Sequence, residues 1–122
     1  IYASGPPITS VGGHGTEPGM NGVAVQQAAS VEEIINAVNE HADRGVDLVK
    51  IMVDGLTLPQ LGAAIETAHE RGIKIVGHAE EPGAGRAVAL GIDGIEHAAS
   101  GSAPAYCRVT AGRDGNGGKS CP

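Results

Sequence analysis

Three short apolar runs, each directly after a glycine that follows a helix-like segment, constrain the fold of this chain most strongly. The three pairs are Gly45 with residues 46–50, Gly72 with residues 73–78, and Gly91 with residues 92–97. Continuous apolar runs of this length are typical of strands buried on both faces, and glycine commonly ends the helix before such a strand. Strands that alternate with helices in this way pair in parallel through right-handed crossovers. The sequence therefore predicts an α/β fold with a parallel sheet.

Capping residues and the helical spacing of apolar side chains indicate where the helices lie. In a capping box, a hydroxyl residue and a Glu or Gln three positions later bond each other's backbone N–H groups. This spacing occurs twice, at Ser30 with Glu33 and at Thr57 with Gln60. We expect helices over residues 30–44, 57–71 and 82–90, and strands over residues 46–53, 73–79 and 92–98.

The two ends of the chain have a different composition. Residues 1–29 are rich in Gly, Pro, Ser and Thr and show no sustained period, which predicts the tail of a strand followed by a long loop. Residues 101–122 are glycine-rich, with almost no aliphatic periodicity, and their composition gives no reason for them to fold alone. We therefore expect a folded part over residues 1–100 and a tail over residues 101–122.

Length and charge exclude several classes of protein. The chain has 122 residues, which is at most one domain and well short of the roughly 250 residues of a complete eight-stranded βα barrel. A net charge of −6 argues against binding to nucleic acid, because phosphates require clustered Lys and Arg. No apolar stretch predicts a membrane span and no charged leader predicts a signal peptide, so we expect a cytoplasmic protein with no membrane partner. Cys107 and Cys121 match no zinc spacing.

Each of the three apolar runs ends in a polar side chain. These residues are Lys50, His78 and His97. Parallel βα units keep their chemistry at the carboxyl ends of the strands, where the three groups lie at nearly the same height. Because side chains alternate along a strand, each shares a face with the residue two positions earlier, in the pairs Leu48 and Lys50, Val76 and His78, and Ile95 and His97. If these faces look inward, the three groups converge.

Histidine is an ordinary metal ligand, whereas a lysine ammonium has no lone pair with which to bind a cation. Taken alone, Lys50 is explained by snorkelling or a salt bridge, and His78 or His97 by a hydrogen bond in the core. Their joint occurrence at equivalent points of three units favours a metal site. Lys50 must then be neutralised, paired or chemically altered, and a carbamate formed with CO₂ would give it two anionic oxygens.

These residues resemble the amidohydrolase superfamily, particularly the branch similar to imidazolonepropionase and the Xaa-Pro dipeptidases. The resemblance covers roughly residues 1–100 and rests on four motifs: residues 4–8 with 12–15, residues 45–51, residues 77–79 and residues 94–97. It implies a partial (β/α) TIM-type barrel of about three to four parallel strands, from the end of strand three to strand six. Family members also use a His-x-His pair on the first strand and an aspartate after the eighth, and neither is present in this chain.

By the same resemblance, Lys50 is a carboxylated, catalytic lysine, and Lys50, His78 and His97 hold one or two divalent ions, with zinc favoured. His14 in its glycine-rich loop is implied to contact substrate, with a flexible loop residue as the alternative. Such a site activates water, so we expect a promiscuous hydrolase of amides, esters, lactones or organophosphate triesters. An incomplete barrel leaves sheet edges and an apolar face uncovered, which predicts a homo-oligomer.

Other residues and functions stay open as alternatives. Asp54 and the pair Glu80-Glu81 follow two of the strands and are candidates for a replacement base or an extra ligand, or are solvated loop carboxylates. His41 and His69 lie near helix C-termini, where the dipole favours a partly positive imidazole, and we assign them no catalytic role. The competing functions are a non-catalytic, truncated barrel remnant that self-associates, and a small-molecule binding module built on the His14 loop.

Overall fold

The computed structural model describes residues 1–20, 22, 24–79 and 83–96. Five residues that the sequence singled out lie outside the described residues: Glu80, Glu81, His97, Cys107 and Cys121. The expected tail over residues 101–122 also lies outside them.

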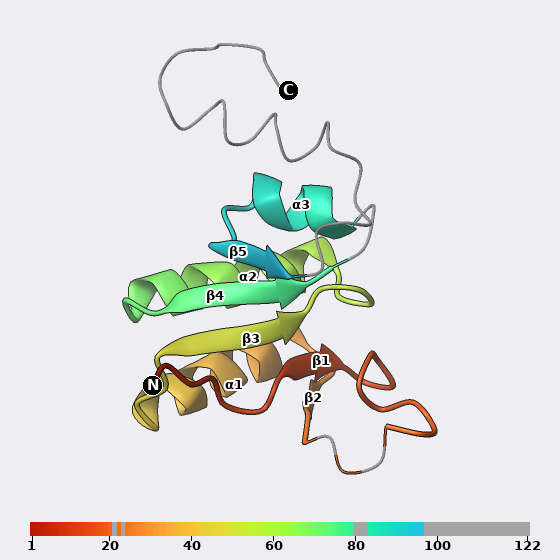
Figure 1. The fold of residues 1–122 in the computed structure, drawn as a ribbon. Helices are drawn as coiled ribbons and strands as arrows, with labels where there is room; N and C mark the ends of the chain where they lie inside the picture. Colours follow the sequence, from red (N-terminus) through yellow and green to blue (C-terminus); the bar gives the residue numbers. More distant parts are fainter. Residues whose placement is uncertain (21, 23, 80–82, 97–122) are drawn as a thin grey trace, which may run out of the picture.

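A five-stranded parallel sheet is the framework of the described chain (Figure 1). The strands are β1 Ile8–Ser10, β2 Gln26–Ala28, β3 Leu48–Met52, β4 Lys74–His78 and β5 Gly94–Glu96, in the spatial order β2-β1-β3-β4-β5. The helices are α1 Val31–Asp43, α2 Leu58–Glu70 and α3 Gly83–Ala89. Each helix precedes a strand that joins the same sheet, so the α/β fold expected for part of a barrel is confirmed.

The strand count exceeds the expected three to four because residues 1–29, predicted as the tail of one strand followed by a long loop, contribute two strands. β1 and β2 are three residues each, and they pair in parallel with Ile8 opposite Gln26. Three residues are too few to show a period of two, and Gln26 and Gln27 do not resemble a buried strand. Pairing with β1, which only the folded chain provides, makes this segment a strand.

The helix starts predicted at Ser30 and Thr57 are confirmed. The Thr57 hydroxyl accepts a hydrogen bond from the Gln60 backbone N–H, and the Gln60 side chain accepts one from the Thr57 N–H, which completes the box. At α1 the Ser30 hydroxyl accepts from the Glu33 N–H, but the Glu33 carboxylate accepts from the N–H of Ala29 instead. These bonds satisfy backbone groups that have no partner within the helix.

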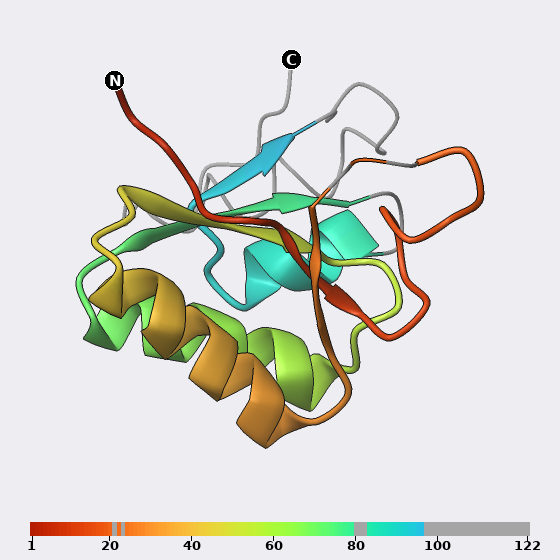
Figure 2. The ribbon, with the colours of Figure 1, turned by 90° about the horizontal axis from the view of Figure 1, so that it is seen from below.

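The helices cover one face of the sheet, and the hydrophobic core lies between the two layers. Figure 2 shows α1 and α2 side by side beneath the strands. Val49, Ile51 and Ile75 point into this core and are fully buried. Burying a side chain of this size stabilises the fold by about 1.5–3 kcal/mol. The alternate residues of β3 and β4 lie on the opposite face, which we call the open face, and they are partly buried except for Lys74, which is exposed.

Two aspartates fix the amino ends of strands. Asp47 exchanges two hydrogen bonds with Ala3: its N–H donates to the Ala3 carbonyl and its carboxylate accepts from the Ala3 N–H. Asp93 makes the same exchange with Ile75. In each case the aspartate lies two residues after the glycine that ends the preceding helix. Its side chain adds one hydrogen bond to those that join the neighbouring backbone segments.

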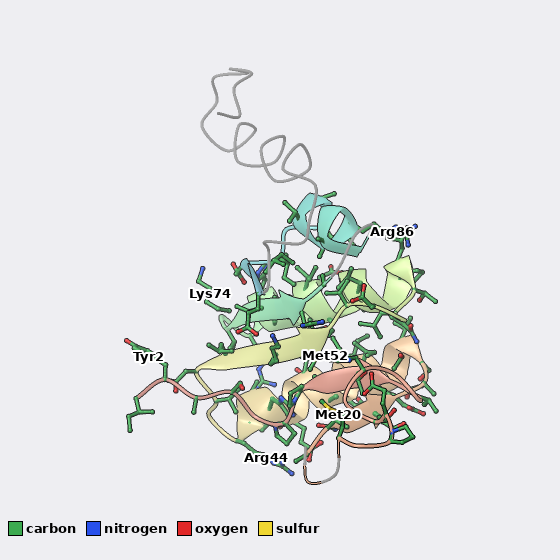
Figure 3. The ribbon with its side chains drawn as sticks, turned by 45° about the vertical axis from the view of Figure 1, so that its right-hand side comes forward. Tyr2, Met20, Arg44, Met52, Lys74 and Arg86 are labelled. Atoms are coloured by element: carbon green, nitrogen blue, oxygen red, sulfur yellow. The ribbon has the colours of Figure 1, made fainter. Side chains whose placement is uncertain are left out.

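The periphery carries long polar or aromatic side chains. Figure 3 shows Tyr2, Arg44 and Lys74 projecting away from the sheet and helices. Within the part of the chain that the structure describes, no helix is long and apolar enough to cross a membrane.

Candidate functional site

A row of side chains crosses the open face near the carboxyl ends of three neighbouring strands. The register places Met52 of β3 opposite His78 of β4, and His78 opposite Glu96 of β5. Lys50 lies two residues before Met52 on β3, on the same face of the sheet, and it is opposite Val76 of β4. The sheet therefore brings Lys50, His78 and Glu96 to one surface, although they come from three separate βα units.

The strand β5 does not present the face that the sequence predicted. Ile95 lies opposite Gly77 and packs against the core, so it faces the helices, whereas Glu96 is on the face of Lys50 and His78. The expectation that Ile95 shares the face of Lys50 and His78 is therefore wrong, because the register of β5 with β4 places Glu96 on that face. His97 lies outside the described residues, so its place on this surface stays a prediction.

Lys50 is held between the strands by a carboxylate. Its ammonium forms an ion pair with Glu96, and only 12% of its side chain is exposed compared with 52% for Glu96. Burial lowers the pKa of Lys50, because a desolvated ammonium is disfavoured. The salt-bridged lysine that the sequence left open as an alternative is the form found in this structure.

The loop after β1 places the imidazole of His14 against the imidazole of His78. The rings of His14 and His78 are stacked, with 4.7 Å between centroids and an interplanar angle of 17°. The loop follows the end of β1 closely, since a side chain at Gly13 would place its Cβ 2.5 Å from the hydroxyls of Thr9 and Ser10. The residue predicted to contact substrate is thus brought directly to a predicted metal ligand.

Glu17 fixes the orientation of His14, and the sequence reasoning overlooked it. One carboxylate oxygen is 2.8 Å from His14 Nδ1, and the other accepts the Gly15 N–H at 2.6 Å. Two backbone N–H groups, its own and that of Gly15, lower the pKa of Glu17, and the hydrogen bond from His14 adds to them. The spacing of a histidine and an acid three residues apart was the available signal, but a loop gives that spacing no fixed geometry.

The residues of the open face fit a divalent cation in their chemistry. Imidazole and carboxylate are ordinary zinc ligands, and His78 and Glu96 supply one of each on the same surface. Among the described residues no group of three or more His, Cys, Asp or Glu side chains is arranged to hold a metal. A complete site therefore needs an altered Lys50, a ligand from outside the described range, or both.

Asp54, the candidate replacement base, follows Val53, whose N–H donates to the His78 carbonyl. It lines a small hollow beside α3, together with Gly83 and Arg86. A Cβ on Gly83 would lie 2.7 Å from Asp54 Oδ1, so the loop carboxylate packs tightly against the start of α3.

His41 has a structural role that its position near a helix C-terminus did not suggest. It is fully buried beneath Gly5, and its Nε2 is 2.9 Å from Gln26 Oε1, which links α1 to β2. Burial lowers the pKa of His41, with Arg44 adding to this effect and Glu40 opposing it. The expectation of a partly positive imidazole at a helix C-terminus is therefore wrong for His41, because burial disfavours the charged form of the ring.

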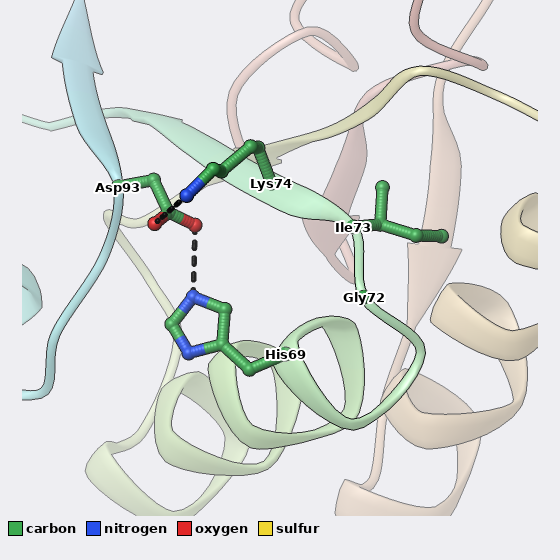
Figure 4. A pocket seen from close by; sticks show the side chains of 5 residues that line it. All are labelled: His69, Gly72, Ile73, Lys74 and Asp93. Carbon is green, nitrogen blue, oxygen red and sulfur yellow. Dashed lines mark hydrogen bonds and ion pairs between the residues drawn. The ribbon is translucent and has the colours of Figure 1, made fainter.

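His69 belongs to a separate cluster before the amino ends of β4 and β5 (Figure 4). Its Nε2 is 2.8 Å from Asp93 Oδ2, and Lys74 lies 3.5 Å from Asp93 Oδ1. Burial raises the pKa of Asp93, but the Ile75 N–H, His69 and Lys74 together outweigh it, so the net pKa is lowered. The cluster joins the end of α2 to the start of β5.

Parallel strands, helices on one face and polar groups at the carboxyl ends define the fold class as part of a βα barrel. Solved structures of amidohydrolases match this chain. A Xaa-Pro dipeptidase with methionine bound in its active site is 26% identical, with a TM-score of 0.76 over 95% of this chain and 34% of that chain. A prolidase complexed with N-methylphosphonate-L-proline is 23% identical (TM-score 0.79, 95% and 34%), and A. niger ochratoxinase is 21% identical (TM-score 0.75, 87% and 32%).

The resemblance to the amidohydrolase superfamily is confirmed by these matches, and the chain has the fold of part of an amidohydrolase barrel. It spans about a third of the length of the structures that it matches. A scan against family models and a search of curated proteins found no match.

Proposed function

We propose that this chain carries the metal centre of a hydrolase that cleaves amide, ester, lactone or organophosphate triester bonds. The observation that supports the proposal best is the meeting of Lys50, His78 and Glu96 on the open face, with His14 stacked on His78. Neighbouring structures with the same fold are hydrolases by name, a dipeptidase and an ochratoxinase among them.

In this proposal the ion is held by carboxylated Lys50, His78 and His97. A neutral amine reacts with CO₂, and burial favours the neutral form of Lys50 because it lowers the pKa of that amine. The carbamate would then face the Glu96 carboxylate, and because two adjacent anions repel each other, a cation between or beside them is favoured. Carboxylation of Lys50 would thus convert its ion pair with Glu96 into a cation site.

A bound divalent ion would supply two effects: it would lower the pKa of bound water toward about 7 and polarise the electrophile. The protein's own residues hold and orient the reactants. The half-exposed His14 lies at the surface of the site, where it can bind the substrate. Because a metal-activated water attacks many electrophiles, we propose a broad substrate range that includes activated esters and triesters.

The test is metal content, measured by elemental analysis of gel-filtered protein loaded with Zn²⁺. The proposal requires about one or two ions per chain in the wild type and none in a Lys50→Ala, His78→Ala, His97→Ala variant. His69→Ala is the matched control, because this histidine also pairs with a carboxylate but lies in the separate cluster. Wild-type protein that takes up no metal contradicts the proposal and favours a non-catalytic barrel remnant.

We also propose that copies of the chain associate through the open face. Leu48, Met52 and Val76 are only partly buried there, and within the described residues β5 pairs with β4 alone. Apolar faces and unpaired strand edges favour pairing with another copy. Light scattering at working concentration tests this, and a stable monomer contradicts it.

A further inference from the structure

A small hollow lies beyond the carboxyl end of β3, between the first turn of α2 and α3. Its volume is about 180 Å³, and the described residues that line it include none of those in the proposed metal centre. Sites for drug-sized ligands are larger, at roughly 300–1,000 Å³, so this hollow suits a small molecule. We propose that it binds a free α-amino acid with a branched apolar side chain, such as leucine. The inference is independent of the proposed function, because it assigns no role in hydrolysis.

Four apolar side chains form one part of the lining. Val53 and Leu61 belong to the hydrophobic core and are 3% and 2% exposed, so they form the floor of the hollow. Leu56 is partly buried, and Leu58, at 53% exposed, lies at the rim. A branched aliphatic side chain placed against these four residues would remove apolar surface of both partners from water, which is favourable.

Two side chains of opposite charge line the same hollow. Asp54 comes two residues after β3, and Arg86 lies on α3 (Figure 3). A guanidinium is permanently charged and matches a carboxylate with two parallel hydrogen bonds. A carboxylate accepts several hydrogen bonds at once, so Asp54 can receive an ammonium group in addition to its other contact. An α-amino acid carries a carboxylate, an ammonium and a side chain on one carbon, so it complements the cation, the anion and the apolar floor together.

The walls of the hollow are held by the fold before any ligand binds. The Leu56 N–H donates to the Val53 carbonyl at 3.1 Å, which fixes the turn after β3, and the capping box fixes the start of α2. A Cβ on Gly83 would lie 2.7 Å from Asp54 Oδ1 and 3.3 Å from Val53 Cγ1, so glycine at this position permits the close approach of α3 to the turn. A site that is already ordered loses less entropy on binding, which favours affinity.

The test is a titration of the ¹⁵N-labelled full chain with leucine, followed by NMR at the backbone amides of Gly55, Leu56 and Gly83. We expect saturable shifts at these amides with a Kd on the order of 1 mM, as for a small ligand with few contacts. Three analogues each lack one part of leucine: 4-methylpentanoate lacks the amino group, 3-methylbutylamine the carboxylate, and glycine the side chain. Each should bind about tenfold more weakly, because each loses a charge-assisted hydrogen bond or the burial of an aliphatic side chain.

Two substitutions assign the charged contacts. Arg86→Gln should weaken the binding of leucine about tenfold but leave the affinity for 3-methylbutylamine unchanged, because this amine has no carboxylate. Asp54→Asn should weaken the binding of leucine by a similar factor but not the binding of 4-methylpentanoate, which has no amino group. Arg44→Gln, at an exposed arginine after α1, is the control and should bind leucine as the wild type does. Because Arg86 is exposed, its variant should fold, and its result stands whether or not Asp54→Asn is folded.

Three results would each overturn the inference. The first is the absence of saturable shifts at the three amides with leucine at about 50 mM, well above the expected Kd. The second is glycine binding as tightly as leucine, which would mean that the apolar floor is not used. The third is an Arg86→Gln variant that binds leucine as tightly as the wild type. None of these measurements needs a bound metal, so they are separate from the metal content that tests the proposed function.

Discussion

The side chains of Lys50 and Glu96 form an ion pair across the open face, although 46 positions separate them in the sequence. Lys50 is on β3 and Glu96 is on β5, so the pair spans the intervening strand β4. The pair ties together three of the five strands at the site where the chemistry is proposed.

Glu96→Gln should lower the affinity for Zn²⁺ while changing the free energy of unfolding by less than about 1 kcal/mol. Glu96 is half-exposed, so its ion pair adds little stability, but its charge lies beside the proposed cation. Titration calorimetry measures the affinity and urea denaturation the stability. Glu66→Gln, on the surface of α2, is the control, and equal zinc affinity in all three proteins would contradict the prediction.

Gly5→Ala should destabilise the protein by about 1–3 kcal/mol, the usual effect of overpacking. A Cβ at Gly5 would lie 3.0–3.2 Å from three atoms of the buried His41 ring. Gly62→Ala is the matched control: its Cβ has no neighbour within 4 Å, and Ala in a helix should stabilise by about 0.5–1 kcal/mol. Both effects are measured by chemical denaturation, and a neutral Gly5→Ala would mean that the His41 ring can shift.

Stability should fall as the pH drops below about 6.5 because of His41. The pKa of His41 in the folded state is lowered from 6.5 by burial, so below that pH the unfolded chain binds more protons and gains stability relative to the fold. The slope is at most about 1.4 kcal/mol per pH unit for one proton. Denaturation between pH 7.5 and 5 compares the wild type with His41→Asn, in which this contribution should disappear.

Asp93→Ala should cost about 1–3 kcal/mol, because it leaves the Ile75 N–H without its acceptor and removes the contacts to His69 and Lys74. Since the folded pKa of Asp93 is lowered, its contribution is present above about pH 3.8 and is lost as the pH falls through the folded value. Asp43→Ala, at an exposed surface ion pair, should change stability by less than about 1 kcal/mol. Equal effects of the two variants would contradict a special role for Asp93.

Much of the fold was predictable because its signals are local. The capping residues Ser30 and Thr57 act on backbone groups within one turn, and glycine adopts the left-handed conformation after α1 and α2, with φ of +76° at Gly45 and +71° at Gly72. The prediction was wrong in detail where a strand depends on its partner, as for β2, and at β5, where the register with β4 places Glu96 rather than Ile95 on the face of Lys50 and His78.

The sequence by itself determined the order of strands and helices and the residues at the carboxyl ends of the strands, because periodicity, caps and glycines act over a few residues. Only the tertiary structure decided which of those residues meet. The pairing of Lys50 with Glu96 depends on strand register, and the contact of His14 with His78 depends on a loop folded over the end of β1. Register and loop path are set by packing between segments far apart in the chain, which no local pattern records.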